Sequence, residues 1–394
     1  MSSSNRREFI KKAGIGCASV SAGLAAAGLV PRRIFAAESP GFTRIVYRQL
    51  GSTGFKASEI GFGCMNMRDP ELVHAAIDSG INYIDTAHLY MNGANEETVG
   101  QVMKTQRDKV FLTTKVPKRK PEEMEAMMET SLKRLQTDHV DLMLLHVAST
   151  RDNILNEDYI KVFDRARQKG ICRFVGISNH ANQTEVLDAV LESKFWEAAL
   201  IGYNYMSPPG VSESIEKARK AGIAIIAMKN LLTASWPPSP LDDIRTDKSG
   251  KITKAQTFIK WVLDDPYVDT TIPGMTAFEH LAEDMAVMGI RMSFDERRTL
   301  YRYGERLRGH YCAGVAGCTG CLDQCPKGVH VCDLNRCIGY ADGYDDIALA
   351  RENYHELPRT TRVEVCDDCG ECKVKCVNGL DLTYTVQRAK ELFA

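Results

Sequence analysis

The chain has 394 residues, and its 50 lysine and arginine residues are balanced by 51 aspartate and glutamate residues. This balance excludes a bulk electrostatic field that would hold nucleic acid or an anionic membrane surface. Because single hydrophobic cores stop growing near about 250 to 300 residues, we expect one large domain with smaller attachments.

The first residues have the composition of an export signal rather than of a folded domain. Arg6 and Arg7 precede an uncharged run, residues 13–30, that is rich in alanine, glycine and serine. This pattern resembles a twin-arginine signal, and small residues at 36–37 offer a cleavage site. We expect an exported, periplasmic or otherwise extracytoplasmic protein with no stable membrane span after signal removal. A membrane anchor is the alternative, although an anchor usually requires about 20 strongly apolar residues.

Short apolar runs alternate with amphipathic stretches after a β-hairpin expected around Ser52-Thr53-Gly54. The predicted strands cover residues 60–64, 81–86, 110–115, 140–146, 173–178, 198–203, 223–228 and 268–272. The helices that follow them cover residues 70–79, 96–104, 121–135, 158–168, 183–192, 212–220, 255–263 and 278–285. Eight apolar strands in succession, each followed by a helix, predict an α/β fold of the (β/α)8 TIM-barrel type. An open doubly wound sheet is the alternative, but no Gly-x-Gly-x-x-Gly turn follows the first strand.

Polar side chains stand at the carboxyl ends of three consecutive predicted strands. Asp85 and Tyr90 follow the second strand, Lys115 ends the third and His146 ends the fourth. Active sites of such barrels lie at this end. A lysine cation held by a buried aspartate lowers the pKa of a nearby phenol from about 10, which makes Tyr90 a usable general acid. A neutral His146 can orient a carbonyl oxygen. Taken alone, each of these residues could instead have a purely structural role, for example as a turn cap or as a surface charge.

The chain resembles the aldo-keto reductase family over residues 44–290. Residues 85–96 follow its Asp-Thr-Ala-x-x-Tyr-x-x-Gly-x-x-Glu signature, and Lys115, His146 and residues 176–179 come in the expected order. The resemblance implies a catalytic tetrad, Asp85, Tyr90, Lys115 and His146, that moves hydride between NADP(H) or NAD(H) and a small-molecule carbonyl or alcohol. The implied cofactor contacts are Ser178, Asn179, Met228, Lys229, Gly274, Thr276 and Asp284. For Met228 and Lys229 the structural alternatives are core packing and a solvated surface charge.

Ten of the 13 cysteines lie between Cys312 and Cys376. One run has the C-x2-C-x2-C-x3-C spacing of an iron-sulfur ferredoxin loop, namely Cys366, Cys369, Cys372 and Cys376. A second run resembles the other half of such a motif with a lengthened first gap, namely Cys312, Cys318, Cys321 and Cys325. Such regular crowding is not required for disulfides, so we expect a metal site.

In two-cluster ferredoxins the fourth cysteine of each run serves the other cluster. On that pattern one [4Fe-4S] cluster would be bound by Cys312, Cys318, Cys321 and Cys376. The other would be bound by Cys366, Cys369, Cys372 and Cys325. A single cluster and a zinc site remain alternatives, because four thiolates also suit tetrahedral zinc. Cys332 and Cys337 are expected to be packing thiols.

The expected organisation is a signal over residues 1–37, a barrel over 44–290, a linker helix over 291–311 and a ferredoxin-like domain over 312–394. We expect an exported oxidoreductase whose clusters relay electrons to a redox partner protein or only stabilise the tail. The alternative is a barrel without turnover that acts as a redox carrier or scaffold, which Leu200 and Met228 would permit. The substrate, the choice between NADPH and NADH, and the oligomeric state are left open.

Overall fold

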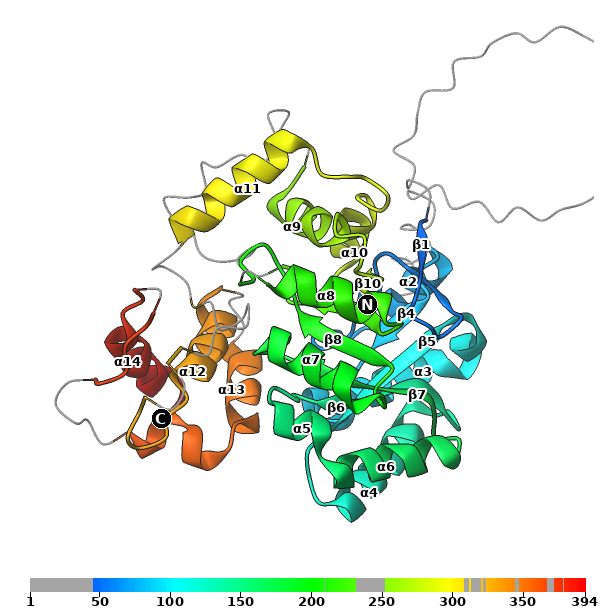
Figure 1. Ribbon diagram of the computed structural model, residues 1–394, viewed down its shortest axis with the longest axis horizontal. Helices are drawn as coiled ribbons and strands as arrows, with labels where there is room; N and C mark the ends of the chain where they lie inside the picture. The colour runs from blue at the N-terminus through cyan, green and yellow to red at the C-terminus, as the bar shows by residue number, and fades with distance from the viewer. Residues whose placement is uncertain are drawn as a thin grey trace, which may run out of the picture.

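The computed structural model describes residues 45–208, 210–231, 252–307, 312, 320–321, 324–343, 347–366, 372–377 and 379–394 (Figure 1). The predicted export signal lies outside these residues, as do Cys318 and Cys369. Within the described part of the chain, no helix combines the length and the apolar character needed to cross a membrane.

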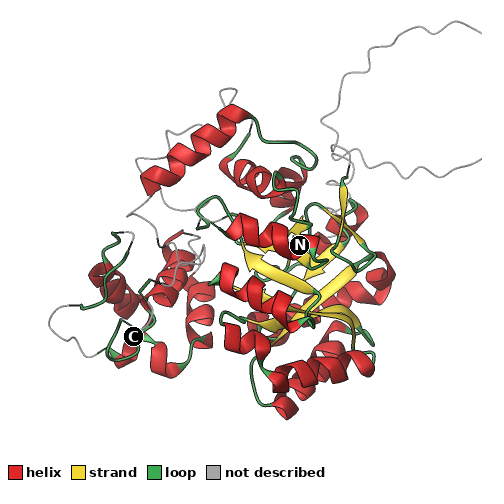
Figure 2. Ribbon diagram, in the orientation of Figure 1, coloured by secondary structure: helices red, strands yellow, loops and turns green. Residues whose placement is uncertain are grey.

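A parallel sheet of eight strands forms the centre of the larger domain (Figure 2). The strands are β3 (Phe62–Gly63), β4 (Tyr83–Asp85), β5 (Phe111–Pro117), β6 (Val140–His146), β7 (Cys172–Asn179), β8 (Ala198–Gly202), β9 (Ala224–Met228) and β10 (Thr270–Thr271). They are neighbours in chain order, and parallel bridges from Ile60 to Thr271 and from Gly63 to Gly274 join the first strand to the last. The α/β class and the eight parallel strands predicted from the sequence are therefore confirmed.

Helices cover the outside of this sheet, as the amphipathic pattern predicts (Figure 2). Polar caps define several of them: Asp69 accepts a hydrogen bond from the Glu71 amide, and Thr253 and Gln256 form a capping box. The helices are α2 (Pro70–Asp78), α3 (Ala94–Gln106), α4 (Pro121–Leu135), α5 (Arg151–Leu155), α6 (Glu157–Gln168), α7 (Gln183–Ser193), α8 (Val211–Lys220), α9 (Lys254–Leu263) and α10 (Phe278–Met285).

The sheet separates two hydrophobic cores because successive strand side chains point to opposite faces. On β6, Met143 and Leu145 contact the outer helices, whereas Leu142 and Leu144 belong to the interior cluster. The antiparallel hairpin of β1 (Tyr47–Gln49) and β2 (Lys56–Ser58) contributes to the interior through residues such as Leu50 and Ala57. The interior is thus a packed core, and only the strand ends are available for a site.

Helix α11 (Phe294–Leu307) follows the barrel where the sequence predicts a linker helix. Its Leu300 and Tyr303 pack with Phe258 of α9, and Glu296 accepts a hydrogen bond from the buried Lys260 amino group. An apolar contact and a buried ion pair therefore fix α11 to the barrel.

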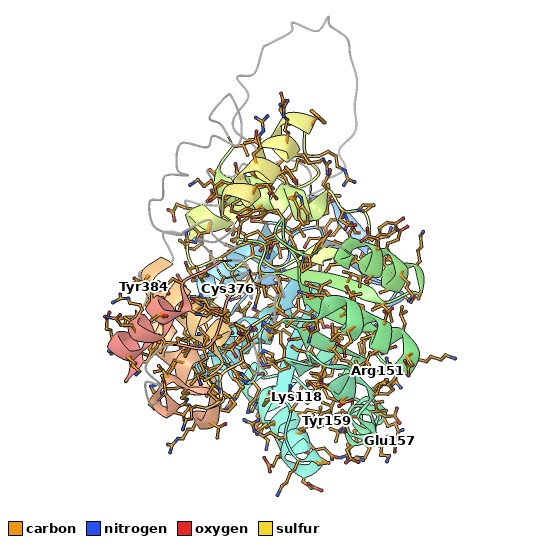
Figure 3. All side chains as sticks on the ribbon, turned by 60° about the vertical axis from the view of Figure 1, so that its left-hand side comes forward. Lys118, Arg151, Glu157, Tyr159, Cys376 and Tyr384 are labelled. Carbon is orange, nitrogen blue, oxygen red and sulfur yellow. The ribbon has the colours of Figure 1, made fainter. Side chains whose placement is uncertain are left out.

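The last helices form a small helical unit, which we call the C-terminal module (residues 320–394 where described). It contains α12 (Val331–Ile338), the π-helix η4 (Gly339–Gly343), α13 (Ile347–Glu356), the short 3-10 turns η5 (Arg359–Thr361) and η6 (Val363–Val365), and α14 (Leu382–Phe393). Leu334, Tyr354 and Ala389 are fully buried in its core. Figure 1 shows this module beside the barrel, and Figure 3 places Cys376 and Tyr384 in it.

Candidate active site

The register of three strands brings Asp85, Lys115 and His146 to the same end of the barrel. Tyr83 of β4, Phe111 of β5 and Leu144 of β6 belong to the interior cluster. Positions two residues apart share a face, so Asp85, Lys115 and His146 continue the inward-facing rows to the carboxyl ends of these strands. All three side chains are buried.

Lys115 is the centre of the site. Its Nζ donates hydrogen bonds to Asp85 Oδ1 at 2.5 Å, to the Thr86 carbonyl at 2.6 Å and to Tyr90 Oη at 3.2 Å. Burial by itself lowers the pKa of Lys115, but Asp85 and Tyr90 more than offset that effect, so its pKa is raised. The lysine is therefore a fixed cation aimed at the phenol oxygen.

Tyr90 lies on the loop after β4, at the start of the 3-10 turn η1 (Tyr90–Gly93). Its ring is half-buried, with Lys115 Nζ 4.7 Å from the ring centroid. The His146 ring meets it edge-on, with 5.9 Å between the centroids. The phenol, the amino group and the imidazole thus surround one small region at the barrel mouth, by which we mean the carboxyl-terminal end of the strands.

His146 and His180 are neighbours at this mouth, with ring centroids 6.2 Å apart and ring planes tilted by 52°. Burial, followed by the positive charge of Lys115, lowers the pKa of His146 to about 3. Burial, followed by Lys229, also lowers the pKa of His180 well below its ordinary value. Both rings are neutral near pH 7. His146 Nδ1 is buried and has no hydrogen-bond partner within the described residues, so a neutral imidazole is available to a ligand.

Further hydrogen bonds and contacts hold the Tyr90 loop in place. They account for other residues of the 85–96 motif that do not belong to the tetrad. Thr86 donates to Asn95 at 2.6 Å, and the Asn95 amide donates to the Cys64 carbonyl at 2.7 Å. Gly93 has φ 96°, and a Cβ there would lie 2.3 Å from the Arg134 guanidinium, which itself pairs with Glu96. A glycine is required at this position by both the backbone and the neighbour.

Ser178 and Asn179 end β7 and are both fully buried. The Ser178 hydroxyl accepts a hydrogen bond from the Val147 amide at 3.4 Å. The Asn179 side chain donates to the carbonyls of Ala148 and Ala181 at 3.1 and 2.5 Å, while its Oδ1 is buried without a partner among the described residues. An orphaned buried amide oxygen beside the tetrad fits a ligand that carries an N–H donor, such as a carboxamide.

The two predicted cofactor residues at the end of β9, Met228 and Lys229, lie in different environments. Met228 packs in the interior core beside Ile226 and Ile272, as does Leu200, so the core-packing alternative describes its observed environment. Lys229 is half-buried at the mouth and has φ 61°. Burial, followed by the charge of Arg336, lowers its pKa to about 7.

The predicted cofactor residues near β10 occupy different environments. Gly274 and Thr276 are exposed, and the Thr276 hydroxyl lies 3.3 Å from His280 Nδ1. Asp284 is only 2% exposed, and burial raises its pKa well above the ordinary value, with Glu283 adding to the effect. The environment of Asp284 on α10 therefore disfavours the charged form of its carboxyl group.

Strained backbone concentrates at the mouth. Met91, Asn92, Val147 and Lys229 all have φ between 52° and 61°, a left-handed conformation that side chains with a Cβ rarely adopt. Val147 is β-branched, and its carbonyl accepts a hydrogen bond at 2.6 Å from Lys118 Nζ, which also contacts Asn153. Tertiary contacts therefore impose the conformation, as is common at functional sites.

Seven cysteines lie in the hydrophobic core of the C-terminal module, five of them predicted metal ligands and two of them expected packing thiols. These are Cys321, Cys325, Cys332, Cys337, Cys366, Cys372 and Cys376. Cys337, one of the expected packing thiols, is fully buried. Cys332, the other, forms a hydrogen bond between its thiol group and that of Cys321. Within the described residues no three cysteine, histidine or acidic side chains adopt a metal-binding arrangement. The donor chemistry, thiolates alone, is nevertheless that of iron-sulfur or zinc sites.

Comparisons with known proteins agree with this geometry. The family model described as "Aldo/keto reductase family" matches residues 59–237. The uncharacterized oxidoreductase YqkF of Bacillus subtilis is 24% identical over 293 residues, which cover 63% of this chain and 93% of that protein. Methylglyoxal reductase DkgB of Salmonella typhimurium is 24% identical over 251 residues, covering 61% and 90%.

Solved structures give the same result. The aldo-keto reductase from Klebsiella pneumoniae in complex with NADPH superposes with a TM-score of 0.56 at 26% identity, covering 66% of this chain and 95% of that chain. The barrel with its Tyr90, Lys115, Asp85 and His146 constellation defines an oxidoreductase. Over residues 59–237 the chain matches the aldo/keto reductase family, and the proteins that it is similar to include oxidoreductases and an aldo-keto reductase solved with NADPH.

Two residues of the mouth and one residue of the C-terminal module were not among the sequence predictions. His180 directly follows Ser178 and Asn179, and Lys118 follows β5, so their positions at strand ends were a usable signal. Arg336 of α12, whose charge contributes to the lowered pKa of Lys229, had no such signal, because its position depends on how the C-terminal module packs.

Proposed function

We propose that the protein reduces a small carbonyl compound with NADPH, with Tyr90 as proton donor. When bound, the dinucleotide would supply the hydride that the carbonyl carbon receives. Tyr90 Oη gives its proton to the carbonyl oxygen, so that an alcohol forms and the phenolate is compensated by the Lys115 ammonium group. The Lys115 amino group bonded to both Asp85 and Tyr90 is the observation that carries this proposal.

His146 orients the substrate in this mechanism. A neutral imidazole donates a hydrogen bond to the carbonyl oxygen without competing with Tyr90 as an acid, and a histidine whose pKa is about 3 stays neutral throughout the working range. Ser178 and the unsatisfied Asn179 oxygen would hold the nicotinamide carboxamide. The choice of NADPH is supported by the Klebsiella pneumoniae relative, which was solved with that cofactor.

The test is an anaerobic assay that follows NADPH absorbance with methylglyoxal and a panel of other small aldehydes. Saturable turnover supports the proposal. Quenching of tryptophan fluorescence by NADPH without turnover of any aldehyde would instead support the alternative of a non-catalytic redox carrier or scaffold. Repeating the titration with NADH decides the cofactor preference.

We also propose that the C-terminal module holds one or two [4Fe-4S] clusters. The support is the ferredoxin spacing of its cysteines and the gathering of the described ones in one core. The cysteines would bind the metal and shield it from water, and a cluster would supply single-electron transfer to a redox partner protein. Anaerobic purification with iron and sulfide analysis tests this: about eight irons per chain indicate two clusters, about four indicate one, and zinc without sulfide contradicts the proposal.

A last proposal concerns location: the protein is exported by the twin-arginine route to an extracytoplasmic compartment. The support is the paired arginines followed by an uncharged small-residue stretch. Cell fractionation and N-terminal sequencing of the exported chain test it. Retention of Met1 or Ser2 in a cytoplasmic fraction would refute it.

A further inference from the structure

Helix α4 lies on the outside of the barrel, yet one of its side chains reaches the loop that carries Tyr90. Arg134 lies in the last turn of this helix. Its Nη1 donates hydrogen bonds to the His88 carbonyl at 3.1 Å and to Glu96 Oε2 at 3.4 Å. His88 comes before Tyr90 in the chain and Glu96 comes after it. A single guanidinium group therefore holds the chain on both sides of the phenol.

The middle of the same loop also lies close to this guanidinium group. A Cβ at Gly93 would lie 2.3 Å from Arg134 Cζ and 2.5 and 2.6 Å from its two terminal nitrogens. Only a residue without a side chain allows such a close approach. Arg134 thus lies against the loop at three points, one before Tyr90 and two after it.

Helix α4 is itself fixed at this position. A Cβ at Gly100 of α3 would lie 2.1 Å from the Arg134 carbonyl oxygen, so the two helices approach as closely as glycine permits. Three residues earlier on α4, Ser131 is fully buried and its hydroxyl oxygen lies 3.0 Å from His88 Nδ1. Residues three apart share a helix face, so α4 directs two polar groups at the loop from a fixed base.

The buried carboxyl group of Glu96 depends on the polar groups around it. It accepts a hydrogen bond at 2.6 Å from the hydroxyl of Thr114, the residue before Lys115. Burial raises the pKa of Glu96, and the hydroxyls of Thr114 and Ser131 together with the charge of Arg134 offset only part of this effect. Removal of Arg134 would therefore strand a buried carboxyl group beside the strand that carries Lys115.

The hydrogen bond that prepares the phenol is sensitive to the position of the loop. Lys115 Nζ lies 3.2 Å from Tyr90 Oη, at the long end of the usual range for an N–H···O bond. A small displacement of the loop away from β5 would break this bond. The loop must therefore be held from outside the barrel as well as by Lys115.

We propose that Arg134 is a positioning residue for Tyr90: it fixes the loop from His88 to Glu96 so that the phenol stays within hydrogen-bonding distance of Lys115. The inference rests on the proposed role of Tyr90 as proton donor. Arg134 acts through the loop and not on the substrate, so its loss should lower kcat while NADPH affinity is kept.

The first test uses the full chain with its metal, NADPH and methylglyoxal. Arg134→Met removes the hydrogen bonds but keeps an unbranched side chain, and we expect kcat to fall by about 100-fold, as for a displacement of about 1 Å at a catalytic group. Arg134→Lys should recover part of kcat, because an ammonium group keeps the charge but not the planar fork. Lys133→Met, at the exposed neighbouring position, is the matched control and should behave as the wild-type protein.

Two further variants separate positioning from a loss of stability. In Arg134→Met combined with Glu96→Gln no carboxylate is stranded, so the melting temperature should recover while kcat stays low. In Arg134→Ala the vacated site is open to solvent, since the arginine side chain is 24% exposed. Millimolar guanidinium chloride should therefore restore turnover in Arg134→Ala and leave the wild-type protein unaffected.

A spectroscopic signal separates this inference from the reductase proposal. In protein labelled with 13Cζ-tyrosine, the Tyr90 resonance is assigned by its absence from Tyr90→Phe, and it reports the surroundings of the phenol without turnover. It should move in Arg134→Met and keep its position in Lys133→Met. An unmoved resonance, an unchanged kcat in Arg134→Met, or an equal change in Lys133→Met overturns the inference. In a protein that turns over no aldehyde, the resonance alone decides.

Discussion

Lys115 and Asp85 form a buried ion pair in which the same ammonium group that Asp85 holds at 2.5 Å also donates to Tyr90 at 3.2 Å. The aspartate fixes the lysine, and the lysine fixes the phenol. Since each member is buried or half-buried, the three groups depend on one another for both charge balance and geometry.

Tyr90→Phe removes the proton donor and leaves the ring in place. We expect turnover to fall by about 100-fold to 10,000-fold, the range for loss of a general acid, while NADPH affinity stays unchanged. Stopped-flow assays and fluorescence titration measure the two quantities. Tyr301→Phe, at an exposed position of α11, serves as the control and should be fully active. An active Tyr90→Phe enzyme would remove Tyr90 from the mechanism.

Asp85→Asn leaves the Lys115 ammonium group buried without its counter-ion. We expect the free energy of unfolding to fall by about 3 to 5 kcal/mol, because breaking a buried pair strands the remaining charge. Turnover should fall as well. Urea denaturation gives the stability. The control is Glu157→Gln, which removes the exposed Lys161 partner and should cost less than about 0.5 kcal/mol. An equal effect of the two changes would contradict the buried pair.

Acidification should destabilise the fold through three buried or half-buried histidines. Burial, followed by neighbouring cations, lowers the pKa of His146 to about 3 and of His88 to about 4, and the pKa of His180 is also lowered. The unfolded chain binds protons at these residues near pH 6.5, whereas the folded chain does not. Their contribution to stability is therefore complete above about pH 6.5 and is lost as the pH falls toward 4, by about 1.4 kcal/mol per pH unit for each histidine.

The measurement is urea unfolding at pH 7 and pH 5. The loss of stability between the two values should be smaller in His180→Asn than in the wild-type protein. His139→Asn, a partly exposed residue, should show the wild-type difference. A pH dependence that is identical in all three proteins would show that His180 is not the source.

Two glycines of the barrel should respond differently to alanine. At Gly176 a Cβ would lie 2.4 Å from the Ala198 carbonyl oxygen of the neighbouring strand, whereas at Gly274 nothing lies within 4 Å. We expect Gly176→Ala to lower the melting temperature by several degrees, consistent with overpacking of about 1 to 3 kcal/mol. Gly274→Ala should fold normally and change only cofactor affinity. Equal melting temperatures for the two variants would contradict the packing at Gly176.

The sequence predicts the barrel well and the C-terminal module poorly. Each barrel strand is apolar and each helix amphipathic, so Lys115 and His146 could be assigned to strand ends from local pattern alone. Helices are expected between Cys325 and Cys366, and the one predicted over residues 346–355 corresponds to α13, but no residue range is predicted for α12 or α14. In α12 a cysteine takes an apolar position: Cys337 is buried where a leucine would mark a helix. The position of Arg336 depends on long-range packing, which has no local signature.

The left-handed backbone at Met91, Asn92, Val147 and Lys229 has a consequence for engineering this enzyme. A library selected only for thermal stability should accumulate glycine at these positions, since glycine relieves the conformational cost of about 1 to 2 kcal/mol at each. In the same variants the backbone beside Tyr90 and His146 should become more flexible, so that these two side chains are positioned less precisely. Substitutions at these four residues should therefore raise thermal stability while they lower catalytic efficiency. A useful screen must select for both properties.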